Sequence, residues 1–128
     1  MPGTSPGMTI RVILTFSSSQ QLPALLVSLY YYHMSGGWVY IMTNRPNGTL
    51  YVGVTSDIPR RIWEHREGLA DGFTKRYQMK RLVYIERHED IGSATQREKN
   101  MKHWPRAWKV RLVLEMNPTW ADLYNGLV

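Results

Sequence analysis

The sequence predicts a small α/β domain in which a three-stranded mixed sheet is flanked by helices. Three observations favour this class. Apolar, β-prone segments interleave with segments of helical periodicity. Helix caps and turn formers separate the segments. The chain has 128 residues, 43% of them apolar, which is enough for one hydrophobic core but not comfortably for two. The expected order of elements is β-β-α-β-α-α.

The first half contains a β-hairpin followed by a helix. Residues 38–43 are apolar and β-prone, residues 44–48 are dense in turn formers, and residues 49–55 alternate again. Asp57 can cap a helix that continues to about Glu67, with Pro59 in its first turn and Gly68 after its end.

The second half contains one strand and then helices. Residues 81–89 are rich in Leu, Val, Tyr and Ile and predict the third strand. Asp90 can cap a helix that reaches Trp104, and Pro105 can start another that ends near Met116. Asn117-Pro118 is expected to open a last short helix.

Residues 1–35 differ in composition from the remainder, because Arg11 is their only charged residue. Their apolar run 22–32 contains Pro23 and is about half the ~20 residues that span a bilayer, while residues 17–21 interrupt any signal-peptide core. We therefore expect no membrane insertion or export. The functional domain is expected at residues 36–128, starting near Met34, after a disordered or loosely attached extension of residues 1–35.

The charge and the cysteine content limit the partners and the compartment. Fourteen of the sixteen Lys and Arg residues, but only seven of the ten Asp and Glu residues, lie between residues 60 and 111. This excess favours nucleic acid over a membrane, since no polybasic block adjoins an apolar span, although an inert basic surface fits the charge equally well. The absence of cysteine excludes disulfides and thiolate-bound zinc, and it favours the cytoplasm.

Three polar residues occupy inward positions of the predicted helices. Arg61 and His65 share one face of the first helix, and Glu98 lies on the inward stripe of the later one. The stripes are marked by Ile58, Ile62 and Leu69, and by Ile91, Ala94 and Met101. A buried carboxylate needs a cation. From periodicity alone, a salt bridge from Glu98 to Arg61 or to a lysine is preferred over a metal.

Two tyrosines lie on the arms of the hairpin. Tyr40 opposes Tyr51 on one face if the loop has four residues, whereas a five-residue loop places them on opposite faces. Taken alone, such tyrosines are usually packing residues. Gly53 continues the Tyr51 face, and this position indicates either close approach of a ligand or a β-bulge.

These residues together resemble a known family. Gly37-Trp38-Val39-Tyr40, then Tyr51-Val52-Gly53, Arg61, His65 and Glu98 are similar in order and spacing to the motifs of GIY-YIG nucleases. The resemblance extends from about residue 36 to residue 123 and is closest to small single-domain bacterial members. It implies a mixed sheet with helices and a metal-dependent endonuclease acting on DNA, in repair or recombination. It assigns no residue to the active-site asparagine that many members have.

The resemblance also implies the roles of the site residues. Glu98 would hold one Mg²⁺ or Mn²⁺, and Arg61 would clamp the phosphate oxygens. Tyr51 would be the general base, with its pKa lowered by Arg61 and the metal, and Tyr40 would orient it by a hydrogen bond. His65 would accept a proton or hold a water, because histidine titrates near neutrality. Taken alone, an inward histidine such as His65 is more often a packing residue than a catalytic one.

Residues outside this group have simpler expected roles. Four basic residues in the loop after the first helix would contact the nucleic-acid backbone: Lys75, Arg76, Lys80 and Arg81. Three tryptophans are expected in or near the core, namely Trp63, Trp104 and Trp108, although an exposed one could stack on a flipped or frayed base. His88 and His103 are expected at the surface. RNA stays open as a substrate, and the oligomeric state is not indicated. The rival functions are a non-catalytic DNA-binding module of the same fold and a protein-interaction subunit.

Overall fold

The computed structural model of the protein describes residues 36–70 and 72–127. Its elements, in chain order, are strands β1 (Gly37–Thr43) and β2 (Leu50–Thr55), helices α2 (Ile58–Arg66) and α3 (Phe73–Arg76), strand β3 (Arg81–His88), helices α4 (Ile91–Lys102) and α5 (Arg106–Met116), and the 3-10 helix η2 (Tyr124–Leu127).

The sheet has the strand order β2-β1-β3. The expected three-stranded sheet flanked by helices is confirmed, but β1 pairs antiparallel with both neighbours, so the described sheet is antiparallel and not mixed. Every residue of the central strand β1 is buried, as its apolar sequence requires. A register shift between Ile41 and Met42 interrupts the pairing of β1 with β3.

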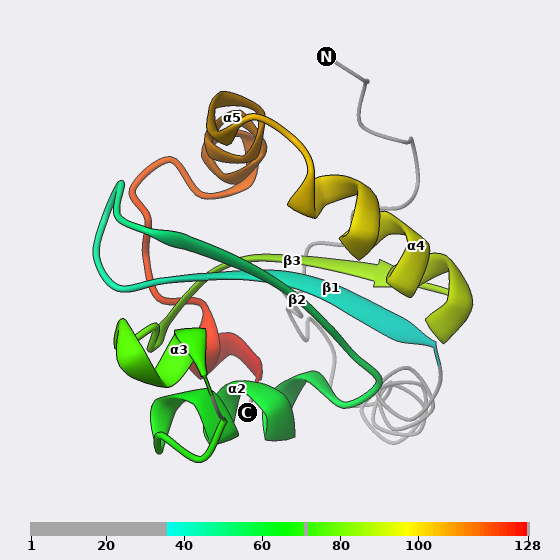
Figure 1. The fold of residues 1–128 in the computed structure, drawn as a ribbon, viewed down its shortest axis with the longest axis horizontal. Coiled ribbons are helices and arrows are strands. Elements are labelled where there is room, and N and C mark those ends of the chain that lie inside the picture. The colour runs from blue at the N-terminus through cyan, green and yellow to red at the C-terminus, as the bar shows by residue number, and fades with distance from the viewer. Residues whose placement is uncertain (1–35, 71, 128) are drawn as a thin grey trace, which may run out of the picture.

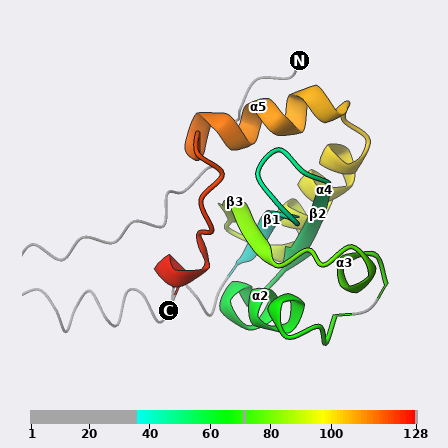
Figure 2. The same ribbon diagram turned by 90° about the vertical axis from the view of Figure 1, so that its left-hand side faces the viewer.

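Helices cover both faces of the sheet. In Figures 1 and 2, α4 and α5 lie on one face, and α2 and α3 lie on the other. Two apolar clusters correspond to these layers. One joins Val39, Ile41 and Val52 of the sheet to α4 and α5, and the other joins Trp38, Tyr40 and Met42 to α2. The domain thus has a core on each side of one thin sheet.

The predicted helix starts and inner faces are largely confirmed. Asp57 caps α2 by accepting a hydrogen bond from Arg60 N at 3.3 Å, and Asp90 caps α4 by accepting one from Ser93 N at 2.7 Å. Ile58, Ile62, Ala94 and Met101 are buried, but three residues expected inside are exposed. Leu69 (61% exposed) lies beyond the end of α2, Ile91 (46%) occupies the first turn of α4, and Trp63 (46%) lies on the outer side of α2.

Two expectations about the short elements are wrong. The loop expected after α2 contains the four-residue helix α3, which Thr74 and Met79 anchor with buried side chains. No helix begins at Asn117-Pro118. There the chain makes a turn in which Trp120 N donates to Asn117 O, Trp120 has a φ of 58°, and the 3-10 helix follows only at Tyr124.

The segment after α5 lies along the free edge of β3. Asp122 Oδ1 accepts from Leu82 N at 3.2 Å, and Leu123 N donates to Leu82 O at 2.8 Å. Arg66 of α2 pairs with the other oxygen of Asp122 at 2.6 Å. These contacts cover a strand edge that would otherwise present unpaired backbone groups.

The expectations for the N-terminal extension fall on residues 1–35, which lie outside the described residues. Within the part of the chain that the structure describes, no helix is long and apolar enough to cross a bilayer.

Candidate active site

The hairpin register brings the two tyrosines to one face. Thr43 pairs with Leu50, Tyr40 with Gly53, and Met42 with Tyr51, so the tyrosines are diagonal neighbours and not direct partners. The loop is longer than either length considered from the sequence. Tyr40 therefore pairs with Gly53, two residues beyond the expected partner Tyr51, and a shift of two residues keeps both tyrosines on the same face of the sheet. Their ring centroids are 6.3 Å apart.

Gly53 is required by the ring of Tyr40. A Cβ at this position would lie 2.3 Å from Tyr40 Cζ and 2.4 Å from its hydroxyl oxygen. Neither a ligand nor a β-bulge is needed to explain this glycine, since the shift in register lies at Ile41/Met42. The close approach expected at Gly53 is therefore made by the Tyr40 side chain.

Tyr40 and His65 form the buried part of the site, and Arg61 lies beside Tyr40. The Tyr40 hydroxyl lies 2.8 Å from His65 Nε2, and both side chains are almost fully buried. Burial raises the pKa of Tyr40 although the interaction of its hydroxyl with Arg61 opposes the shift. Tyr40 is consequently a neutral phenol at physiological pH. Its hydroxyl contacts His65 and not Tyr51, unlike the expected arrangement.

His65 does not titrate near neutrality in this structure. Burial, followed by the nearby charge of Arg61, lowers the pKa of His65 to about 4. The imidazole is therefore neutral at pH 7, contrary to the expectation of a residue that gains or loses a proton there. His65 Nδ1 is buried and has no hydrogen-bond partner among the described residues.

Tyr51 is the more accessible tyrosine. Its ring centroid lies 5.6 Å from that of His65, and on its other side it stacks on Phe73 of α3. Arg61 is partly exposed beside Tyr40, whose interaction raises the pKa of the guanidinium, and it donates to Glu64 Oε1 at 3.2 Å. A fixed positive charge thus lies at the open side of the tyrosine pair.

Glu98 is buried, as predicted, and its nearest cation is a lysine. Lys102 Nζ lies 2.5 Å from Glu98 Oε1 and 5.9 Å from the centre of the Tyr51 ring. Lys102, one helical turn after Glu98, therefore connects α4 to the tyrosine site. The sequence analysis did not single out this lysine, although its spacing of four residues from Glu98 is the signal for such a pair.

The donor set fits a weakly held metal ion. Glu98 Oε1 is buried and lacks an aligned hydrogen bond despite its closeness to Lys102. No group of three or more His, Asp or Glu that could hold a metal occurs among residues 36–70 and 72–127. A hard divalent ion at Glu98 would have one carboxylate from the protein and take its other ligands from water and phosphate, which is common for Mg²⁺.

A second buried acid forms a separate network. Glu86 of β3 accepts from Tyr84 Oη at 2.8 Å, contacts His88 Nε2 at 2.6 Å and pairs with Arg97 Nε at 3.0 Å. His88 is 3% exposed, so the expectation that it lies at the surface is wrong. Arg97 also covers the Trp104 ring. This network joins α4 to β3.

The four basic residues after α2 divide into two places. Lys75 and Arg76 are exposed on α3, next to the aromatic neighbours of Tyr51. Lys80 and Arg81 line a separate hollow of about 350 Å³ with Arg66 and other residues. Arg81 donates to Trp120 O at 2.9 Å, so its guanidinium also holds the C-terminal segment.

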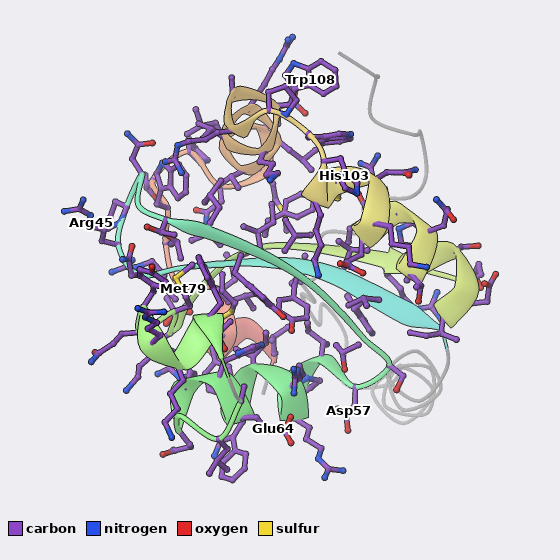
Figure 3. All side chains as sticks on the ribbon, viewed as in Figure 1. Arg45, Asp57, Glu64, Met79, His103 and Trp108 are labelled. Carbon is purple, nitrogen blue, oxygen red and sulfur yellow. The ribbon has the colours of Figure 1, made fainter. Side chains whose placement is uncertain are left out.

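The remaining residues that the sequence analysis named lie away from this group. Trp104 packs against the core and its ring meets that of Trp108 edge to face. Figure 3 shows Trp108 on the outer side of α5 and His103 at the junction of α4 and α5, where it is exposed as expected. Asn117 uses its amide to bind Val83 O, Ala121 O and Ala121 N. It therefore holds the backbone in place.

The antiparallel sheet, its flanking helices and the tyrosine site lie in the part of the chain that matches a known family of nuclease type. Residues 36–111 match the family model described as the GIY-YIG catalytic domain. The chain belongs to the GIY-YIG family, which confirms the resemblance seen in its motifs.

Known relatives are small proteins of about the size of this domain. A UPF0213 protein of Natronomonas pharaonis is 36% identical over 78 residues, which are 61% of this chain and 91% of that protein. A UPF0213 protein of Staphylococcus aureus is 34% identical over 82 residues, which are 64% of this chain and 99% of that protein. No solved structure matches the chain.

Proposed function

We propose that this protein is a divalent-metal-dependent endonuclease that hydrolyses phosphodiester bonds of DNA, in repair or recombination and in the cytoplasm. The observation that carries the proposal is the convergence of Tyr40, Tyr51, His65 and Arg61 on one face of the hairpin, with Lys102 linking Glu98 to the same place. Membership of the GIY-YIG family supports a nucleic-acid substrate.

The residues divide the work of hydrolysis among them. Arg61 binds the non-bridging phosphate oxygens and neutralises the charge that grows on them. Tyr51, in its phenolate form, accepts at its Oη the proton that the attacking water loses as the water oxygen bonds to phosphorus, and so becomes the neutral phenol. Tyr40 and neutral His65 form the buried wall that fixes the position of Tyr51. Glu98 would hold a divalent ion, which would supply a Lewis acid for the oxygen that leaves when the P–O3′ bond breaks.

Nicking of supercoiled plasmid in the presence of Mg²⁺ tests the proposal. Arg61→Ala and Glu98→Ala are each expected to slow nicking by about a hundredfold or more, because each removes stabilisation of transition-state charge. Arg60→Ala and Glu115→Ala are the matched controls, since each removes the same charge from an exposed residue outside the site. Nicking that survives both site substitutions contradicts the proposal.

A non-catalytic nucleic-acid-binding module is the second candidate. The contact of Lys102 with Glu98 favours it, because it neutralises the acid without a metal. This function predicts that the wild type binds DNA with a steep salt dependence but does not nick it at any Mg²⁺ concentration. The same assay therefore separates the two candidates.

A further inference from the structure

A row of three aromatic rings extends from the reaction site onto the surface. Tyr51 stacks on Phe73 with ring centroids 6.3 Å apart and planes inclined by 22°. Phe73 in turn lies 4.5 Å from Tyr77. We call Tyr51, Phe73 and Tyr77 the aromatic row. Its first member touches His65 and Tyr40, so the row is continuous with the site proposed to cut the phosphodiester.

The outer rings of the row are partly exposed, and other side chains of the segment are buried. Phe73 is 44% exposed and Tyr77 is 43% exposed. The anchoring of this short helix is done by Thr74 and Met79, which are buried and joined by a 2.8 Å hydrogen bond from Met79 N to Thr74 O. Two large rings are therefore partly presented to solvent on a helix that has buried anchoring residues of its own.

The charges around the aromatic row are complementary to a polyanion. Arg76 lies over the Tyr77 ring at 5.9 Å, and Lys102 lies over the Tyr51 ring at 5.9 Å. Lys75 is exposed on α3, the helix that carries Phe73. Arg61 lies beside Tyr40 and Tyr51, at the buried end of the aromatic row. Exposed rings interleaved with cations are the surface that binds single-stranded nucleic acid, where bases stack on rings and phosphates meet the charges.

We infer that the aromatic row binds unpaired bases next to the phosphate that is cut, so that the preferred substrate is a single-stranded or locally opened stretch of nucleic acid. Base pairs in a continuous duplex stack on one another and cannot offer a face to Phe73 or Tyr77, whereas unpaired bases can. The inference rests on the proposed function for the position of the cut, but the binding that it describes requires no turnover.

Binding measured without metal tests the inference directly. Fluorescence anisotropy in EDTA compares the full-length protein on a labelled single-stranded DNA, a duplex and a single-stranded RNA of one sequence. The wild type is expected to bind single strands more tightly than duplex. Phe73→Leu and Tyr77→Leu should each weaken single-strand binding by about fivefold or more and leave duplex binding nearly unchanged. Phe73→Trp should retain the preference because it keeps a stacking ring.

The matched control is Trp63→Leu, which removes a ring of similar exposure (46%) that lies on α2 and is not one of the three rings of the aromatic row. The inference is overturned if Trp63→Leu and Phe73→Leu weaken single-strand binding equally. It is also overturned if Phe73→Leu and Tyr77→Leu both retain the preference for single strands. The measurement on RNA tests whether recognition depends on the bases alone. If it does, single-stranded RNA and single-stranded DNA bind with similar Kd values. Should Phe73→Leu fail to fold, Tyr77→Leu at the exposed end decides.

Failure of this inference and failure of the proposed function have different signatures. Mg²⁺-dependent nicking with no effect of Phe73→Leu on single-strand binding leaves the endonuclease proposal in place and removes the role of the aromatic row. Single-strand binding that depends on Phe73 and Tyr77, without nicking by the wild type, leaves the aromatic row in place and removes the endonuclease proposal.

Discussion

At the scale of single residues, the position of Tyr40 depends on the missing side chain of Gly53. A Cβ there would lie 2.3 Å from Tyr40 Cζ, and the ring has no room to retreat because it is 1% exposed. Gly53→Ala is therefore expected to lower the free energy of unfolding by about 1–3 kcal/mol through overpacking. It should slow nicking by tenfold to a hundredfold, roughly, because Tyr40 leaves its place beside His65 and Arg61.

The measurements for Gly53→Ala are urea unfolding and plasmid nicking. Gly92→Ala is a suitable control, since Gly92 lies in the exposed first turn of α4 and the nearest atom to an added Cβ is the carboxylate of Asp90 at 3.1 Å. If Gly53→Ala unfolds and nicks like Gly92→Ala, Tyr40 is not held by the close approach described above.

His65 makes stability depend on pH. Its pKa is about 4 in the folded protein and 6.5 in the unfolded chain, so between these values the unfolded chain binds the proton more readily. The stabilisation is fully present above pH 6.5 and is lost as the pH falls towards 4, by on the order of 3 kcal/mol in total. His65→Gln should flatten this part of the curve of unfolding free energy against pH. His103→Gln, an exposed control, should not.

Lys102 competes with a divalent ion for Glu98. Its ammonium lies 2.5 Å from Glu98 Oε1, and a metal bound to this oxygen must displace it. Lys102→Met keeps the length of the side chain and removes the charge, so the Kd for Mn²⁺ measured by calorimetry should fall by about two- to fivefold. Lys99→Met, on the exposed side of the same helix, controls for the loss of charge. A Kd that rises in Lys102→Met contradicts this competition.

Sequence periodicity identified these inward residues but not their partners. It predicts that His65 and Glu98 point inward, because a helical face depends only on spacing. The spacing of four residues makes Lys102 a candidate cation, but periodicity does not exclude Arg61, whose distance from Glu98 depends on how α2 and α4 lie across the sheet. The pKa of His65 and the contact of Tyr40 with His65 likewise follow from burial between separate segments.

At the scale of elements, the Glu86 network fastens α4 to β3. Glu86 is fully buried and contacts Arg97, His88 and Tyr84. Glu86→Ala leaves the guanidinium and the imidazole without their acid and is expected to lower the free energy of unfolding by about 3–5 kcal/mol. Glu115→Ala, which breaks the exposed pair with Arg111, should cost about 1 kcal/mol or less. Chemical denaturation measures both, and equal losses would contradict a structural role for Glu86.

Element prediction succeeded where the ends of an element carry local signals. Asp57 and Asp90 mark the starts of α2 and α4 in the sequence and cap them in the structure. Helix α3 has no such signal, because Gly72 at its start provides no side-chain cap and four residues show no periodicity. The aromatic row depends on where α3 places Phe73 and Tyr77, so the sequence pattern does not predict it. Asn117-Pro118 has the sequence of a helix cap, but the Asn117 amide binds Val83 O and Ala121 O instead. The contact with Val83 is far away in the sequence, so the local pattern does not predict it.

At the scale of the whole molecule, the two ends of the chain are expected to differ in their importance for the fold. Among residues 36–70 and 72–127, the apolar clusters on both faces of the sheet consist of residues between Trp38 and Leu127. The relatives align over 91% and 99% of their own lengths while covering 61% and 64% of this chain. We therefore propose that residues 36–128 form the functional domain and that residues 1–33 are dispensable for folding and activity.

A protein that begins at Met34 is accordingly expected to keep the melting temperature and nicking rate of the full chain, whereas one that ends at Met116 should lose most of its stability. The second deletion removes Trp120 and Leu127 from the two clusters and Asp122 from the edge of β3. An uncovered edge strand also invites association, so this variant should elute as aggregates on size exclusion. If instead the Met34 variant melts early or loses nicking, residues 1–33 belong to the functional unit, and the boundary near residue 36 is wrong.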